Sequence, residues 1–156
     1  MAQVNSPVMT TDEKSAAAAL RVTIARIYRA LRLSAASGIT PSQVSVLFRV
    51  EQCEPVRMGI LAHLEAITPA TLSKVVDSLE ALELVEREPD PLDGRVTLIR
   101  VSTTGHRLIE AQRAATTRAL EEALGKMEDS HRELLLESLP ALEGLAEILL
   151  TRDENL

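Results

Sequence analysis

The chain has 156 residues, which fits one domain with a single core, or one core plus a seam between subunits. Hydrophobic residues make up 46% of it, yet it holds one Tyr, one Phe and no Trp, so aliphatic residues that favour helices must build the core. No apolar run approaches the ~20 residues of a membrane-spanning helix. The first seven residues lack the pattern of a signal peptide. We therefore expect a single-domain cytoplasmic protein, with residues 1–11 as a flexible tail.

The net charge of −6 argues against a nucleic-acid partner when it is taken alone. Residues 1–39 carry five basic and two acidic side chains, a net charge of +3. Residues 40–102 carry six basic and ten acidic side chains, and residues 103–156 carry six and eleven. The middle segment, which is assigned to DNA below, is thus acidic, and its binding must depend on a few well-placed cations.

Capping boxes, in which Ser or Thr is followed three residues later by Glu or Gln, mark predicted helix starts. Three of them precede predicted helices: Thr10 with Glu13, Thr40 with Gln43, and Ser130 with Glu133. The helices that follow them are expected over residues 12–36, from 41 to about 55, and from 131 to 150.

A short helix is expected over residues 59–65, and Thr68 and Pro69 then begin a fourth helix. Apolar residues recur along this fourth helix at the spacing of an amphipathic helix: Leu72, Val75, Val76, Leu79 and Leu82. Its other face carries Ala70, Thr71, Lys74, Asp77 and Ser78. One face should therefore be buried and the other open to a partner.

Two β-prone runs, residues 85–88 and 96–102, flank the turn-forming loop 89–94 and predict a hairpin. The second, third and fourth predicted helices, followed by such a hairpin, have the order of a winged helix-turn-helix. The fourth helix would then be its recognition helix. The alternative is that this amphipathic helix merely packs in a helical bundle. The hairpin favours the winged helix.

A recognition helix enters the major groove with its N-terminus, and the free amides at helix starts can hold phosphates. The predicted DNA-binding residues at the second and fourth helix starts are Ser42, Gln43, Thr68, Pro69, Ala70, Thr71, Ser73 and Lys74. Lys74 is available for a phosphate or a guanine edge. The fourth helix has no Arg, Asn or Gln for bidentate base reading, so much of the specificity should come from DNA shape.

After the hairpin, Thr103 is expected to cap a long helix that ends near residue 127. The last predicted helix has two neighbouring apolar stripes, a wider arc than a surface helix needs. The stripe that we expect to form a subunit interface is Leu135, Leu139, Leu142, Leu145 and Leu149. The protein is therefore predicted to be a homodimer.

The chain resembles the multiple-antibiotic-resistance regulator (MarR) family over nearly its whole length. The matching segments are residues 67–80, 84–87, 89–95 and 101–105, which include the Asp-Gly-Arg of the loop. The resemblance implies a mainly α fold with a small β-hairpin, in which residues 39–102 form the winged helix-turn-helix lobe. It also implies interlocking dimerisation helices over residues 12–38 and 103–150.

The resemblance further implies that Arg95 enters the minor groove from the wing tip, while Asp93 helps to fix the loop. A narrow groove rich in A·T pairs has an enhanced negative potential, which suits one guanidinium. The alternative is a solvated turn with a local ion pair, worth at most ~1 kcal/mol. Glu83 and Ala66 stand where relatives often have glycine, which leaves the exact ends of those helices open.

Many relatives bind small aromatic or anionic effectors between the dimer helices and the winged helix. Here Tyr28, Arg29, Arg32 and Arg49 offer a ring and cations for an anionic aromatic ligand. The alternative, which we prefer, is that Tyr28 packs internally and the arginines form a solvated face.

The one cysteine and three histidines show no metal-ligand spacing, and no catalytic motif occurs, so we expect no metal, cofactor or enzymatic activity. Cys53 is interpreted as a small buried hydrophobe. The sequence predicts a transcriptional regulator, a repressor that binds a pseudo-palindromic site on double-stranded DNA as a homodimer. The alternative is a dimeric helical module whose winged helix contacts protein, which the acidic lobe favours.

Overall fold

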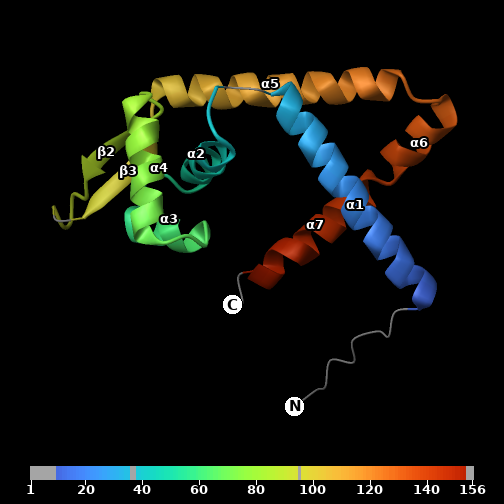
Figure 1. Cartoon of the computed structure of the whole chain (residues 1–156), viewed down its shortest axis with the longest axis horizontal. Helices are drawn as coiled ribbons and strands as arrows, with labels where there is room; N and C mark the ends of the chain where they lie inside the picture. Colours follow the sequence, from blue (N-terminus) through green and yellow to red (C-terminus); the bar gives the residue numbers. More distant parts are fainter. Residues whose placement is uncertain (1–9, 36–37, 95, 154–156) are drawn as a thin grey trace, which may run out of the picture. The chain divides into compact units, whose positions relative to one another are not determined.

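A computed structural model describes residues 10–35, 38–94 and 96–153 of the chain. It is mainly helical with one small sheet, and the predicted winged-helix fold class is confirmed (Figure 1). The elements in chain order are α1 (Thr11–Ser34), α2 (Pro41–Cys53), β1 (Val56–Arg57), α3 (Met58–Leu64), α4 (Pro69–Ala81), β2 (Val85–Pro89), β3 (Thr97–Val101), α5 (Thr103–Gly125), α6 (Asp129–Glu137) and α7 (Leu139–Asp153). Among the described helices, none combines the length and the apolar character that crossing a membrane requires.

The chain divides into two compact units, residues 1–116 and 117–156. The first contains the winged helix and the second contains the C-terminal helices.

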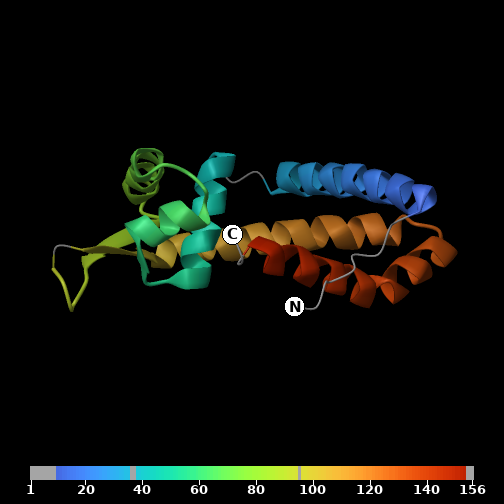
Figure 2. The ribbon, with the colours of Figure 1, turned by 90° about the horizontal axis from the view of Figure 1, so that it is seen from below.

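The sheet has three antiparallel strands in the order β1-β3-β2. Strand β2 pairs with β3 from Val85 opposite Val101 to Pro89 opposite Thr97, and the pair extends beyond the helices of the lobe (Figure 2). This pair is the predicted hairpin. The sequence analysis missed β1, because two residues are too few to show the alternation that marks a strand. Through Val56 opposite Ile99, β1 ties the start of α3 to the hairpin.

The core lies between α2, α3, α4 and the sheet. The predicted apolar stripe of α4 is buried at Leu72, Val76 and Leu79, whereas Leu82 is half exposed because it lies at the C-cap. Ile109 of α5 is fully buried in the same core, so the start of α5 belongs to the winged-helix unit. Each buried Leu or Ile contributes about 1.5–3 kcal/mol.

Two helix ends adopt the left-handed backbone without glycine. Ala66 after α3 has φ 51°, and Glu83 after α4 has φ 57°. After each, the next amide donates to the carbonyl oxygen five residues earlier, at 3.1 Å and 2.9 Å respectively. This pattern closes a helix end in the Schellman manner. The geometry that usually uses glycine is therefore kept here at a cost of about 1 kcal/mol for each residue.

The capping boxes predicted at Thr10 and Thr40 are both formed. The cap expected at Thr103 is wrong by one residue. The hydroxyl of Ser102 accepts from the amide of Gly105 at 2.9 Å, so Ser102 caps α5.

The single last helix expected from 131 to 150 is instead two helices, α6 and α7, separated at Ser138. Pro140 explains the break, because its ring would clash with the carbonyl four residues earlier in a continuous helix. The predicted Ser130–Glu133 capping box is also wrong. Helix α6 begins earlier, with Glu128 at the N-cap and no side-chain hydrogen bond there.

Gly105 is required where the start of α5 lies against the end of α4. The amide of Ser102 donates to the carbonyl of Leu84 at 3.1 Å. A Cβ on Gly105 would lie 2.1 Å from that same carbonyl oxygen and 2.7 Å from Cγ1 of Val101. Any side chain would therefore push α5 away from the sheet.

We expect Gly105→Ala to lower the free energy of unfolding by about 1–3 kcal/mol, the usual effect of overpacking a closed site. Gly59→Ala is the matched control, since a Cβ on Gly59 meets nothing within 4 Å. Urea unfolding at one protein concentration measures both variants. Equal midpoints for wild type and Gly105→Ala would contradict the close approach.

Candidate DNA-binding surface

The N-terminal half of α4 presents small polar groups to solvent. The hydroxyl of Thr68 caps the helix by accepting from the amide of Thr71 at 3.2 Å, and the two threonine hydroxyls lie 2.9 Å apart. Pro69 occupies the first turn, where no amide donor is needed. These residues and Ala70 are exposed, whereas Ser73 is half-buried. This end of α4 therefore offers hydroxyls and the amide of Ala70 to a partner.

Lys74 is exposed on the same helix, and it differs from the other cations of the lobe. Over residues 38–94 and 96–102, every arginine that the structure describes has an acidic partner. The pairs are Arg49 with Glu65 at 3.1 Å, Arg57 with Asp90 at 2.6 Å, Arg87 with Asp77 at 2.5 Å, and Arg100 with Glu88 at 2.5 Å. Lys74 makes no ion pair within those residues. It is the cation of this part that is ready for a phosphate.

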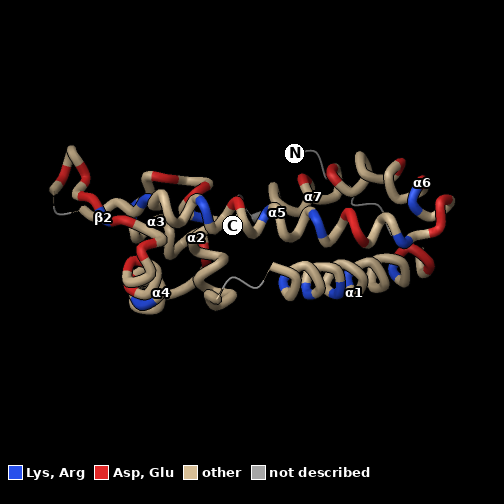
Figure 3. Tube along the Cα trace, turned by 90° about the horizontal axis from the view of Figure 1, so that it is seen from above, with Lys and Arg blue, Asp and Glu red and all other residues tan. Residues whose placement is uncertain are grey.

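The C-terminal half of α4 carries acidic side chains that face the sheet. Arg87 of β2 bonds to Asp77 and, at 3.3 Å, to Glu80. Figure 3 shows the acidic positions gathered on the hairpin, while basic positions are spaced along α1. Because Arg87 compensates two carboxylates of α4, less of their negative charge opposes a DNA phosphate.

The two residues predicted at the start of α2 differ in exposure. Ser42 is exposed, whereas Gln43 is buried. Oε1 of Gln43 accepts from the amide of Thr40 at 2.6 Å, and its Nε2 donates to Oγ of Ser78 at 2.7 Å. Gln43 therefore joins α2 to α4, and its amide is used within the protein. A direct contact of Gln43 with DNA stays a prediction.

Asp90 anchors the wing, and the sequence analysis missed it. Its carboxylate is buried, accepts from the amide of Leu92 at 2.8 Å and from Arg57 of β1 at 2.6 Å. The amide of Leu92 and then the Arg57 guanidinium lower the pKa of Asp90 below its ordinary value. The signal was present in the sequence, because Asp in a turn often accepts from the amide two residues later.

Asp93, the residue expected to fix the loop, lies in the same turn. Its carbonyl accepts from the amide of Val96 at 2.8 Å, and the amide of Asp90 donates to the carbonyl of Val96 at 2.9 Å. The loop is thus closed by backbone bonds around Asp90. Arg95 lies outside the described residues, so its minor-groove role stays a prediction.

The four candidate effector residues lie on two helices. Tyr28, Arg29 and Arg32 are on the surface of α1, and Tyr28 is 65% exposed rather than packed within the chain. Arg49 on α2 is held by Glu65 and Gln52. An effector site at these residues stays a prediction.

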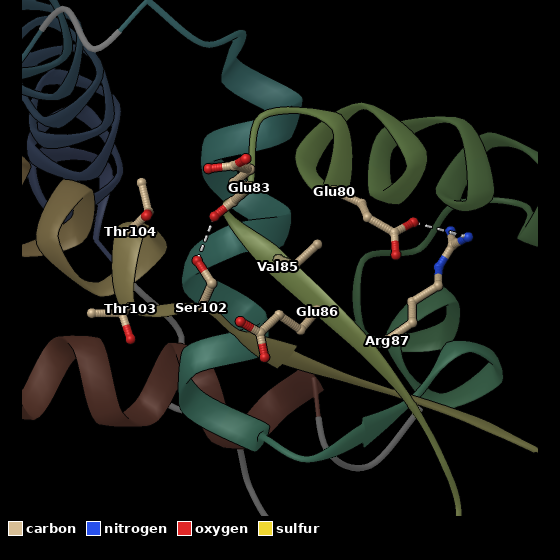
Figure 4. Close-up of a pocket in the computed structure, with 8 residues that line it drawn as sticks. All are labelled: Glu80, Glu83, Val85, Glu86, Arg87, Ser102, Thr103 and Thr104. Atoms are coloured by element: carbon tan, nitrogen blue, oxygen red, sulfur yellow. Dashed lines mark hydrogen bonds and ion pairs between the residues drawn. The ribbon is translucent and has the colours of Figure 1, made fainter.

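An open depression lies elsewhere, between α4, β2 and the start of α5 (Figure 4). Three of its lining residues are Glu80, Glu83 and Glu86, with Arg87 bonded to the first of them. This acidic rim does not suit an anionic ligand.

Cys53, expected to be buried, is exposed at the end of α2. No group of three metal-ligating side chains occurs among the described residues.

The fold and this surface define a winged helix-turn-helix DNA-binding protein. A profile described as the MarR family matches residues 39–97. An uncharacterized HTH-type transcriptional regulator of Mycobacterium bovis is 32% identical over 128 residues, covering 81% of this chain and 90% of the relative. The chain therefore belongs to the MarR family: it is a DNA-binding transcriptional regulator and not an enzyme.

Solved structures share the fold. A transcriptional regulator protein from Pseudomonas aeruginosa superposes with a TM-score of 0.78 at 29% identity, covering 88% of this chain and 98% of that one. A variant of Staphylococcus aureus MepR, solved bound to an oligodeoxyribonucleotide, has a TM-score of 0.66 at 19% identity, with 83% and 96% covered. The second likeness concerns the fold alone.

Replacing Asp90 by Asn should loosen the wing in a pH-dependent way. The folded-state pKa of Asp90 is lowered, so its ionised form stabilises the fold at pH values above the ordinary value of about 3.9. That contribution is lost as the pH falls through the lowered value. We expect wild type to exceed Asp90→Asn in stability at pH 6, and the difference to narrow below about pH 4.

Urea unfolding at several pH values measures this difference, and Glu86→Gln is the control. Glu86 is an exposed carboxylate of β2 without an ion pair among the described residues. A difference in the free energy of unfolding between wild type and Asp90→Asn that stays constant from pH 6 to pH 3 would contradict the stabilising role of the Asp90 carboxylate.

Proposed function

We propose that the protein is a repressor that binds a pseudo-palindromic operator as a homodimer. Each α4 would lie in a major groove and each wing in the adjacent minor groove, with half-sites about one helical turn, ~34 Å, apart. Occupation of such a site excludes other proteins from the promoter. The observation that carries the proposal is Lys74, which lies beside the exposed polar start of α4 and makes no ion pair among the described residues, whereas the described arginines of the lobe are paired.

Two relatives support parts of this proposal. The Staphylococcus aureus MepR variant has this fold and was solved with an oligodeoxyribonucleotide. A Pseudomonas putida protein named as an HTH-type transcriptional repressor is 26% identical over 98 residues, covering 63% of this chain and 62% of the relative. Repression is therefore the direction of regulation that we propose. Since the target is genomic DNA, we expect the protein to act in the cytoplasm.

The homodimer is supported by apolar surface that the single chain leaves uncovered. Helices α1 and α6 have no buried residue. In the predicted interface stripe, Leu135, Leu139, Leu142 and Leu149 are 37–53% exposed, and Leu145 is half-buried. Exposed apolar side chains gathered along one helix usually mark a protein–protein contact. We propose that a second copy covers it, with the helices over 12–38 and 103–150 as the dimerisation region.

Lys74→Ala should weaken binding to all DNA sequences and lower the salt dependence by about one counterion, because one phosphate contact is lost. Arg95→Ala should cost about 1–3 kcal/mol at the operator, because the predicted guanidinium contact in the minor groove is lost. Fluorescence anisotropy with DNA from immediately upstream of the gene, at two salt concentrations, measures both.

Lys126→Ala is the matched control for this titration, since Lys126 is an exposed lysine outside the winged helix. It should leave both the affinity and the salt slope unchanged. Weak binding that is equal on any DNA and indifferent to Lys74 and Arg95 would contradict the proposed operator. It would favour the alternative in which the winged helix contacts protein.

Leu149→Glu should dissociate the dimer, because a buried unpaired carboxylate at a subunit seam is strongly unfavourable. Leu149 is 53% exposed in the single chain, so the change should not unfold the monomer. Leu149→Met keeps the apolar contact and is the control. Sedimentation velocity should give a dimer for wild type and Leu149→Met. A dimer of unchanged affinity for Leu149→Glu would exclude this stripe from the interface.

A further inference from the structure

Leu92 lies in the wing, between β2 and β3, and its side chain is 91% exposed. That is the largest exposure among the large hydrophobic residues that the structure describes as exposed. A single exposed leucine is ordinary on a protein surface. Leu92 is unusual because a hydrogen bond and an ion pair, here called the brace, hold the backbone of its turn.

The brace consists of a buried carboxylate and an ion pair. The amide of Leu92 donates to Oδ1 of Asp90 at 2.8 Å, and Arg57 of β1 holds the other carboxylate oxygen at 2.6 Å. Pro91, the residue before Leu92, has a fixed φ. The leucine is therefore presented from an ordered turn, and a partner that binds it need not first order the loop.

The wing offers an exposed apolar side chain at Leu92, ahead of Arg95, the cation predicted to enter the minor groove. Among residues 88–94 there is no Lys or Arg. Of the three carboxylates there, Glu88 is paired with Arg100 and Asp90 with Arg57. Two of the charges that would repel a phosphate backbone are thus compensated. Leu92 is thus the apolar side chain that the described part of the tip can place against a partner, beside the predicted contact of Arg95.

We propose that Leu92 is a specificity-determining contact of the wing, which packs its side chain against the sugar edges of the minor groove and favours A·T pairs there. This inference rests on the proposed function, because that function brings the wing to the minor groove. Apolar side chains are used in this groove by other DNA-binding proteins. The 2-amino group of guanine projects into the same groove and is absent from A·T pairs. An apolar side chain cannot bond to that amino group, so it disfavours G·C pairs.

The test uses the full-length protein and a site that wild type selects from a random DNA pool. Leu92→Ala should weaken binding to this site about tenfold, the effect of losing one buried leucine. The affinity of Leu92→Met for this site should stay within about twofold of wild type. Glutamine is similar in size but polar, so Leu92→Gln should bind as weakly as Leu92→Ala. The salt slope should be unchanged in all three, while Lys74→Ala lowers it. Thermal unfolding midpoints should not change, because the side chain is exposed.

A second measurement locates the contact in the minor groove. Replacing adenine under the wing by 2,6-diaminopurine adds the 2-amino group and leaves the major-groove edge of the pair unchanged. This DNA should bind wild type more weakly than the parent site, and the penalty should be smaller for Leu92→Ala.

Three results would overturn the inference. They are unchanged affinity of Leu92→Ala while wild type binds its site, an altered salt slope for Leu92→Ala, and equal diaminopurine penalties in both proteins. In each of them the proposed operator binding stands. If wild type selects no site from the pool, the proposed function fails and the inference fails with it.

Discussion

The contact between the end of α4 and the start of α5 holds the recognition helix, the sheet and the long helix together. The amide of Ser102 donates to the carbonyl of Leu84, and its hydroxyl accepts from the amide of Gly105. The same hydroxyl donates to the carbonyl of Glu83 at 2.5 Å (Figure 4). These bonds fix the start of α5 against the winged helix. The left-handed backbone at Glu83 is part of the same arrangement, because it turns the chain from α4 into β2.

The charges of the lobe explain how an acidic segment serves a DNA-binding family. Arginines of the lobe form ion pairs with many of its carboxylates. These arginines are therefore not available to bind phosphates. Surface ion pairs of this kind contribute little stability, typically 0–1 kcal/mol each. Their main consequence is an electrostatic one, because they reduce the negative field around the start of α4. Lys74 lies near small hydroxyls, and Asp77, three residues later on the same face, is paired with Arg87.

The sequence predicted what depends on periodicity and turn chemistry, and it failed where a tertiary contact decides. The stripe of α4 and the hairpin were readable because each repeats over several residues. Strand β1 was not, since its two residues form a strand only against β3. The turn sequence indicated the local bond of Asp90 to the amide of Leu92. The bond of Gln43 to Ser78 and that of Asp90 to Arg57 join residues 35 and 33 positions apart, which no local pattern reveals. Pro140 indicated the break at Ser138. The apolar stripe continues through it, however, and led to the prediction of a single helix.

The division of labour along α4 has an evolutionary consequence. Its burial is carried by the apolar stripe, and its cap by Thr68 with Thr71, whose loss would cost about 0.5–2 kcal/mol. Ala70 and Lys74 contribute neither to the buried stripe nor to the cap, since both are exposed. Substitutions at such positions usually change stability by no more than about 0.5 kcal/mol. In the proposed DNA complex, substitutions at Ala70 can therefore change the preferred sequence and substitutions at Lys74 the overall affinity, while selection for folding acts on the opposite face of the same helix.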